Sequence, residues 1–191
     1  MRDDNLGRAL LAVARYAIAD ELRLGAAVPA TDDALRRPGA TFVTLFCRDE
    51  LRGCIGTLKA TRAVGIDVRE NALAAAFRDP RFPGLIASEY EAISIEISLL
   101  SSPERVRVDS EEELHSSLRP GIDGVMLELD DRRATFLPQV WEVLPDPRAF
   151  LDALKAKAGL PADFWSPRLN VSLYQVTKWK ERDLVHTQAT S

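Results

Sequence analysis

The sequence predicts an α+β fold with a mainly antiparallel sheet flanked by helices. Segments rich in β-branched and aromatic residues occur in pairs joined by short turns, which is the pattern of β-hairpins. Segments with helical periodicity lie between them, but helices and strands do not alternate one by one as they do around a parallel sheet. Because the 191 residues show no internal repeat or linker, we expect a single domain over residues 1–191.

In the first hundred residues, periodicity and helix-breaking residues define each element. The predicted elements, in order, are a helix over 5–24, strands over 41–47 and 51–58, a helix over 63–78 and a strand over 92–100. Asn5 is expected to cap the first helix, and Gly25 follows its end. The second helix has to stop at Asp79, because the residue before Pro80 is disfavoured in the α region. In the last strand isoleucines alternate with polar residues, so one face of that strand is expected to be buried.

The second half of the chain continues the same mixture of elements. The predicted elements are a helix over 111–118, a hairpin over 124–138, a helix that opens at Pro147, a strand over 171–183 and a loose tail over 184–191. The hairpin is expected to turn at Asp130–Asp131. Asp146 has the right side chain to cap the helix that starts at Pro147, and Gly159 is expected to end it.

Composition excludes several classes of function. A net charge of −4 is unsuited to a dedicated nucleic-acid binder, and no apolar run is long enough to span a membrane. Two cysteines and two histidines are too few for a structural zinc site. The spacing of Cys47 and Cys54 permits a disulfide, but we interpret them as reduced thiols of a cytoplasmic protein. The glycines do not have the spacing of a phosphate-binding loop or of a dinucleotide fingerprint.

The segment LRGCIGTL carries the first candidate site. In a regular strand Arg52 and Cys54 would share one face, and Gly56 would leave space beside the sulfur. A cation two residues away favours the thiolate, which is the nucleophilic form of cysteine. Gly53 and Thr57 would lie on the opposite face. The alternative is structural, because free cysteines are often buried and glycines in strands often permit a close helix–strand approach.

Two further segments carry charged candidates. In DPRFPGL the two prolines fix a loop from which Asp79 and Arg81 project, either as binding residues or as a local structural pair. Glu96 interrupts an apolar strand, so it either faces solvent or lines a polar cleft, where Arg52 and Arg81 are its candidate partners. A catalytic cysteine normally needs a base within hydrogen-bond reach, and neither His115 nor His186 is placed as an obvious partner.

These segments together resemble the AMMECR-type domain family, whose bacterial branch is called AmmeMemoRadiSam system protein A. The resemblance rests on LRGCIGTL, DPRFPGL, SIEISLLSSPE, GIDGVML, TFLPQVWE and KAGLP, in this order, and extends from about Gly7 to Asp183. It implies an α+β domain with a smaller lobe forming a cleft. It also implies a signature surface and its neighbours, made of Arg52, Gly53, Cys54, Gly56, Thr57, Asp79, Arg81 and Glu96.

The resemblance further implies two protein partners, a Memo-like protein and a radical SAM protein, but it supplies no established reaction. Our leading hypothesis is a cytoplasmic component of that three-part system, whose RGCIG cleft binds a small anionic ligand or a modified residue presented by a partner. The first alternative is a stand-alone hydrolase or transferase in which Cys54 is catalytic. The second is a scaffold in which the motif is purely structural. We expect no metal, no cofactor, no nucleic acid and no membrane as partners.

Overall fold

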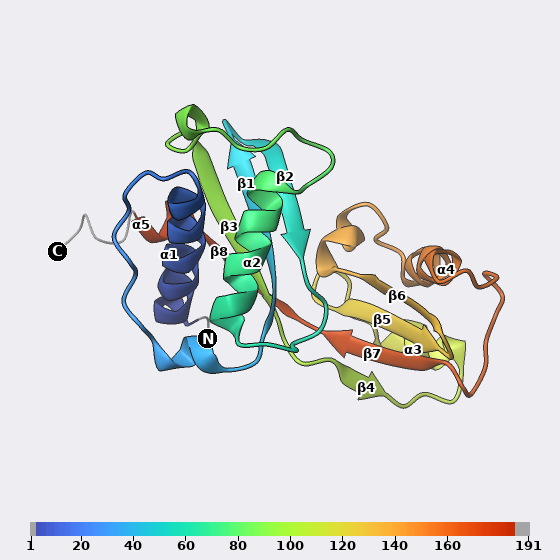
Figure 1. Ribbon diagram of the computed structural model, residues 1–191. Helices are drawn as coiled ribbons and strands as arrows, with labels where there is room; N and C mark the ends of the chain where they lie inside the picture. The colour runs from blue at the N-terminus through green and yellow to red at the C-terminus, as the bar shows by residue number, and fades with distance from the viewer. Residues whose placement is uncertain (1–2, 186–191) are drawn as a thin grey trace. The chain divides into compact units, whose positions relative to one another are not determined.

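The computed structural model describes residues 3–185, which form two compact units (Figure 1). The first unit contains the residues up to Leu100 and those from Thr177 onward, and the second contains 101–176. Both units combine helices with an antiparallel four-stranded sheet, which confirms the predicted α+β fold. That the two fold as one domain stays a prediction.

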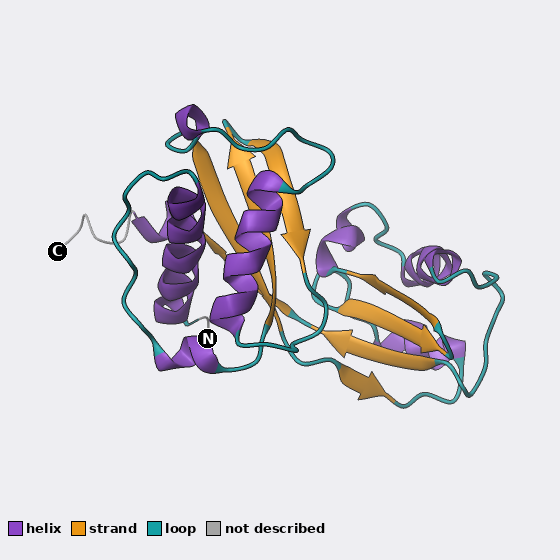
Figure 2. Cartoon of the chain, in the orientation of Figure 1, coloured by secondary structure: helices purple, strands orange, loops and turns teal. Residues whose placement is uncertain are grey.

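The sheet of the first unit has the strand order β2-β1-β3-β8. Its strands are β1 (Ala40–Cys47), β2 (Glu50–Gly56), β3 (Ile93–Leu100) and β8 (Val176–Lys180). The helices α1 (Asp4–Glu21) and α2 (Val64–Phe77) lie against one face of this sheet (Figure 2). Between them is a core of aliphatic side chains that includes Ile18, Val43, Val68 and Ile97. We call this side the helix-covered face.

The opposite face of the same sheet has a different character. Because successive side chains of a strand alternate, residues next to the buried ones point away from the helices. Within the first unit this helix-free face carries Phe42, Thr44, Phe46, Cys54, Ser94, Glu96, Ser98, Lys178 and Lys180. It is therefore the polar face of the sheet, and the RGCIG segment contributes to it through Cys54.

The sheet of the second unit has the strand order β4-β7-β5-β6. Its elements are β4 (Glu104–Val106), α3 (Glu111–Ser117), β5 (Gly124–Leu129), β6 (Arg132–Phe136), α4 (Pro147–Lys157) and β7 (Asn170–Tyr174). Both helices contribute to one apolar core, in which Trp141 stacks on Phe150 with ring centroids 3.8 Å apart. The predicted hairpin and the Asp146 cap of α4 are confirmed.

Two predictions of the fold are wrong in detail, and one strand is additional. Asp3, not Asn5, caps α1, since its carboxylate accepts hydrogen bonds from two backbone N–H groups of the first turn. The predicted strand over 171–183 is two strands, β7 and β8, which belong to different sheets and are followed by α5 (Glu181–Val185). The short strand β4 was not predicted. Most of the predicted tail lies outside the described residues, and none of the described helices is long and apolar enough to cross a membrane.

Candidate functional site

Arg52 occupies a β-bulge in the middle of the RGCIG segment. Leu45 pairs with Gly53 and Phe46 pairs with Leu51, so Arg52 has no partner residue in β1. A bulge interrupts the alternation of side chains and changes the direction of those around it. The prediction that residues 52 and 54 share one face relied on that alternation, and it is wrong.

The guanidinium of Arg52 is used in a structural ion pair. Its Nε and Nη2 donate to the two carboxylate oxygens of Glu89, at 2.8 and 3.0 Å, and the Arg52 side chain is only 11% exposed. This hydrogen bonding lowers the pKa of Glu89 and raises the pKa of Arg52. The nearby sulfur of Cys47 raises the pKa of Arg52 further. Because Cys47 packs against the aliphatic core, Arg52 belongs to the helix-covered face. It ties β2 to the turn that precedes β3.

The two glycines of the motif lie where a side chain would collide with neighbouring atoms. A Cβ atom on Gly53 would lie 2.1 Å from the carbonyl oxygen of Ala75 in α2, so only glycine allows this close approach of helix and strand. A Cβ atom on Gly56 would lie 2.2 Å from the ring of Phe42. The prediction that Gly56 leaves space beside the sulfur is therefore wrong, because the ring of Phe42 occupies that space.

Thr57 also has a structural role. Its hydroxyl donates to the carboxylate of Asp67, at 2.8 Å from either oxygen, and Asp67 is buried in α2. The same carboxylate accepts hydrogen bonds from the backbone N–H and hydroxyl of Thr41, from Arg62 and from Asn71, at 2.7–2.9 Å. Asp67 thus joins both strands of the first hairpin to the helix that covers them.

Cys54, in contrast, lies on the helix-free face and is partly exposed. Its Sγ is 3.3 Å from the hydroxyl of Thr44, the residue opposite it in β1. Because β2 is an edge strand, the outward-facing backbone groups of Cys54 need other partners. Its N–H donates to Asp79 at 2.9 Å, and its carbonyl accepts from Arg81 at 3.3 Å. The DPR segment therefore takes the place of a neighbouring strand at this position.

Asp79 and Arg81 form a fork-shaped ion pair beside Cys54. The Nε and Nη2 of Arg81 donate to the two oxygens of Asp79 at 2.9 and 2.7 Å. Asp79 is buried, whereas the side chain of Arg81 is 53% exposed and its Nη1 has no hydrogen-bond partner among the described residues. The result is a cation that is fixed in position and still open to a ligand.

This ion pair predicts an acid-sensitive part of the stability. Hydrogen bonds from Arg81 hold the pKa of Asp79 well below its ordinary value of about 4. The ion pair therefore contributes its full stabilisation when the pH is above the pKa of Asp79 in the unfolded chain. This contribution is lost as the pH falls toward the lower pKa of Asp79 in the folded protein. We expect urea unfolding to show a shallower loss of stability between about pH 6 and about pH 3 for Asp79→Asn than for the wild type. Arg81→Ala should flatten the curve in the same way, and equal slopes for all three proteins would contradict the prediction.

Glu96 lies in the same cross-strand row as Cys54. Thr44 is opposite Cys54 in β2 and opposite Glu96 in β3, so two strand spacings, roughly 10 Å, separate these two residues. Glu96 forms ion pairs with the neighbouring strand β8, at 3.6 Å to Lys178 and 3.8 Å to Lys180. None of the arginines among residues 3–185 forms an ion pair with Glu96. The sequence analysis did not single out Thr44, Lys178 and Lys180. The alternation of side chains in TFVTLFC and VTKWK could have placed them on the same face of the sheet as Glu96.

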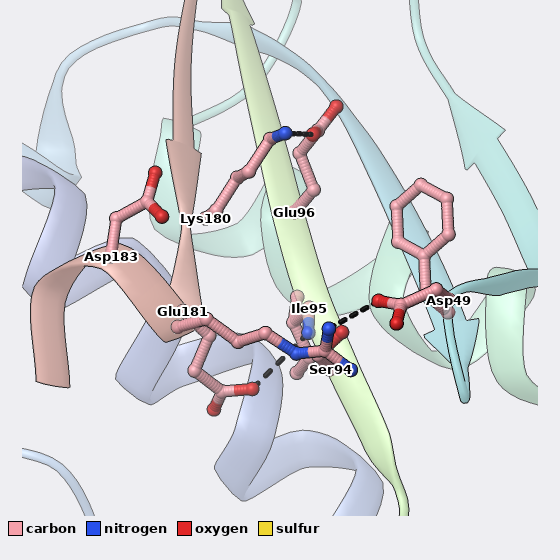
Figure 3. A pocket seen from close by; sticks show the side chains of 9 residues that line it. Asp49, Ser94, Ile95, Glu96, Lys180, Glu181 and Asp183 are labelled. Atoms are coloured by element: carbon pink, nitrogen blue, oxygen red, sulfur yellow. Dashed lines mark hydrogen bonds and ion pairs between the residues drawn. The ribbon is translucent and has the colours of Figure 1, made fainter.

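A pocket of about 390 Å³ opens beside Glu96 (Figure 3). It is lined by Phe46, Asp49, Ser94, Ile95, Glu96, Lys180, Glu181, Arg182 and Asp183. All of these residues belong to the first unit. The pocket was not anticipated from the sequence, because its residues come from four separate segments.

Among the described residues, none is placed as a base to form a catalytic dyad with Cys54. Within residues 3–185, its side chain and outward-facing backbone groups form hydrogen bonds with Thr44, Asp79 and Arg81, and the low pKa of Asp79 makes that carboxylate a weak base. His115 lies in the second unit and His186 lies outside the described residues. The described side chains also contain no group of three or more acidic, histidine or cysteine residues placed to hold a metal ion. The site is chemically a fixed guanidinium next to a thiol.

Comparison with known proteins identifies the family. The AMMECR1 family model matches residues 11–179. A protein of Methanothermobacter thermautotrophicus is 36% identical, with 92% of this chain and 94% of that protein covered, and Protein MK0488 of Methanopyrus kandleri is 34% identical, with 93% and 89% covered. The crystal structure of the uncharacterized protein PH0010 from Pyrococcus horikoshii is similar to this structure with a TM-score of 0.74 and 30% identity, covering 90% of this chain and 89% of that one. The chain therefore belongs to the AMMECR1 family.

Proposed function

We propose that the chain is a binding component of a multi-protein system, and that the surface formed by Cys54 and Arg81 receives an anionic group. The observation that carries this proposal is the state of the guanidinium. Asp79 and the carbonyl of Cys54 hold it in place, yet half of the side chain is exposed and one of its nitrogen atoms is unused among the described residues. A preoriented guanidinium is well suited to bind a carboxylate or a phosphate.

Family membership supports the choice of partners. The resemblance to AmmeMemoRadiSam system protein A suggests a Memo-like protein and a radical SAM protein, and the anionic group would be a small ligand or a modified residue that one of them presents. Three of the other proposed site residues, Arg52, Gly53 and Thr57, have structural roles on the helix-covered face. The proposed binding surface is therefore smaller than the family motif.

The proposal predicts that partner binding depends on Arg81. We expect Arg81→Ala to weaken capture of the Memo-like protein in a pull-down by at least about tenfold, which corresponds to one lost charge-assisted hydrogen bond. Cys54→Ser should weaken it less. Arg78→Ala is the matched control, because Arg78 lies three residues away with a similarly exposed side chain, 57%, but does not contact Cys54. Unchanged capture by a folded Arg81→Ala variant would remove this surface from consideration.

The competing function is a cysteine-dependent enzyme, favoured by the exposed guanidinium next to the thiol. The lack of a base in contact with Cys54 argues against it within the described part of the chain. Alkylation by iodoacetamide separates the two functions. A binding component should be alkylated at Cys54 no faster than a free cysteine peptide at neutral pH, whereas markedly faster labelling would favour the enzyme.

A further inference from the structure

The pocket beside Glu96 contains neither Cys54 nor Arg81, and its lining points to a ligand of its own. Six charged side chains line this pocket. Glu96 is paired with Lys180 and Asp49 with Arg182, while Glu181 is paired with Arg15 outside the lining and Asp183 also lines the pocket (Figure 3). Phe46 supplies an aromatic surface in the same pocket. With four acidic and two basic side chains the lining does not favour a simple anion, and the ammonium group of Lys180 within it can receive an anionic group. The lining matches a ligand that carries both charges.

The carboxylate of Glu96 lacks a hydrogen-bond donor among the described residues. Its side chain is only 12% exposed, yet its nearest cations, Lys178 and Lys180, are 3.6 and 3.8 Å away. These distances exceed those of hydrogen bonds between charged groups, which are about 2.7–2.9 Å. The carboxylate makes no hydrogen bond to any other described residue. Since a mostly buried charge without hydrogen bonds is unfavourable, a donor group in the pocket would be bound well here.

Two neighbouring groups have unused capacity as well. The hydroxyl of Ser94, two residues before Glu96 on the same face of β3, is engaged with none of the described residues and lines the pocket. The side chain of Lys180 is 61% exposed, and its ammonium group has three donors of which none is within hydrogen-bond distance of Glu96. The pocket thus offers two hydrogen-bond acceptors on β3, Ser94 and Glu96, and one donor on β8, Lys180.

We propose that this pocket binds a free α-amino acid with an apolar side chain. The α-ammonium group would donate to Glu96 and Ser94, the α-carboxylate would accept from Lys180, and the side chain would lie against Phe46. The ligand would enter between Glu96 and Lys180 and replace their long ion pair with two hydrogen-bonded ones. The volume of about 390 Å³ is at the small end of the range for ligand pockets, about 300–1,000 Å³, as suits an amino acid.

The proposal is tested by isothermal titration calorimetry with leucine, methionine and phenylalanine. We expect saturable binding of at least one of them with one site per chain. Glu96→Gln should weaken that binding by at least about tenfold, because it removes the charge of the carboxylate that accepts from the ammonium group. Ser94→Ala should weaken it by about threefold, because it removes one hydrogen bond from the ammonium group to a neutral hydroxyl. Glu104→Gln is the control, because Glu104 is an exposed carboxylate on a strand of the second unit. Ser94→Ala keeps the test valid if Glu96→Gln does not fold.

Analogues of phenylalanine test the need for both charges. Phenylalanine amide lacks the carboxylate and 3-phenylpropionate lacks the ammonium group, so both should bind at least about tenfold more weakly than phenylalanine. Absence of saturable binding of all three amino acids up to about 10 mM would overturn the proposal. Equal affinity of the wild type and both pocket variants, or of phenylalanine and its two analogues, would overturn it too.

Discussion

Alanine at position 53 is expected to lower the free energy of unfolding by about 3 kcal/mol, the largest effect of an added methyl group in the RGCIG segment. The new Cβ would lie 2.1 Å from the oxygen and 3.0 Å from the carbon of the Ala75 carbonyl. Both atoms belong to the backbone of α2 and cannot rotate away. Either the helix moves off β2 or the bulge at Arg52 rearranges, and both changes disturb the core of the first unit. Urea unfolding followed by circular dichroism measures the loss.

Gly84→Ala is the matched control for Gly53→Ala. A Cβ at Gly84 would meet only a ring atom of Phe77, at 4.0 Å, so we expect a change within about 0.5 kcal/mol. Gly56→Ala should lie between the two, because the clashing ring of Phe42 is a side chain that can turn. If Gly53→Ala and Gly84→Ala unfolded at the same urea concentration, the close contact between β2 and α2 would not exist.

The sequence was sufficient for elements whose limits depend on local chemistry. Pro80 ends α2 and Pro147 starts α4 through their own backbone restrictions, and isoleucines at every second position mark β3. The division of the segment 171–183 into two strands has no such local signal. The buried residues are Val171 and Tyr174 in β7 and Trp179 in β8, so the alternation shifts phase within the segment, but only the choice of partner strands places β7 and β8 in different sheets.

The candidate site was predictable in its composition and not in its geometry. Asp79 and Arg81 were expected as neighbours of Cys54, and both contact its backbone. The bulge at Arg52 was not predictable, because it depends on the register of β2 against β1, which no single segment encodes. Because of this one extra residue, the side chain of Arg52 pairs with Glu89, and Arg81 is the cation next to the thiol of Cys54.

Most of the RGCIG segment is therefore explained by packing alone. Gly53 and Gly56 permit close contacts with α2 and with Phe42, and Arg52 makes a buried ion pair. Cys54 is the residue of the motif whose side chain lies on the helix-free face without a comparable structural task. Tests of binding are accordingly most informative at Cys54 and Arg81, while substitutions at the other positions report on folding.

Removal of the Asp67 carboxylate tests the structural side of the same motif. We expect Asp67→Ala to lower the free energy of unfolding by about 4 kcal/mol, because it leaves the buried N–H and hydroxyl of Thr41 and the cation of Arg62 without this acceptor and removes one of the three acceptors of the Asn71 amide. Asp67→Asn keeps the shape and one acceptor oxygen, so its effect should be smaller. Urea unfolding measures both.

The matched control is Asp20→Ala, which removes an exposed carboxylate from a helix of the same unit. A surface substitution of this kind is expected to change the stability by no more than about 0.5 kcal/mol. Thr57 loses its partner along with Asp67, so Thr57→Val should add little destabilisation to Asp67→Ala while being costly in the wild type. Additive effects of the two substitutions would show that Thr57 is not coupled to Asp67, and Thr57 would then return to the set of candidate binding residues.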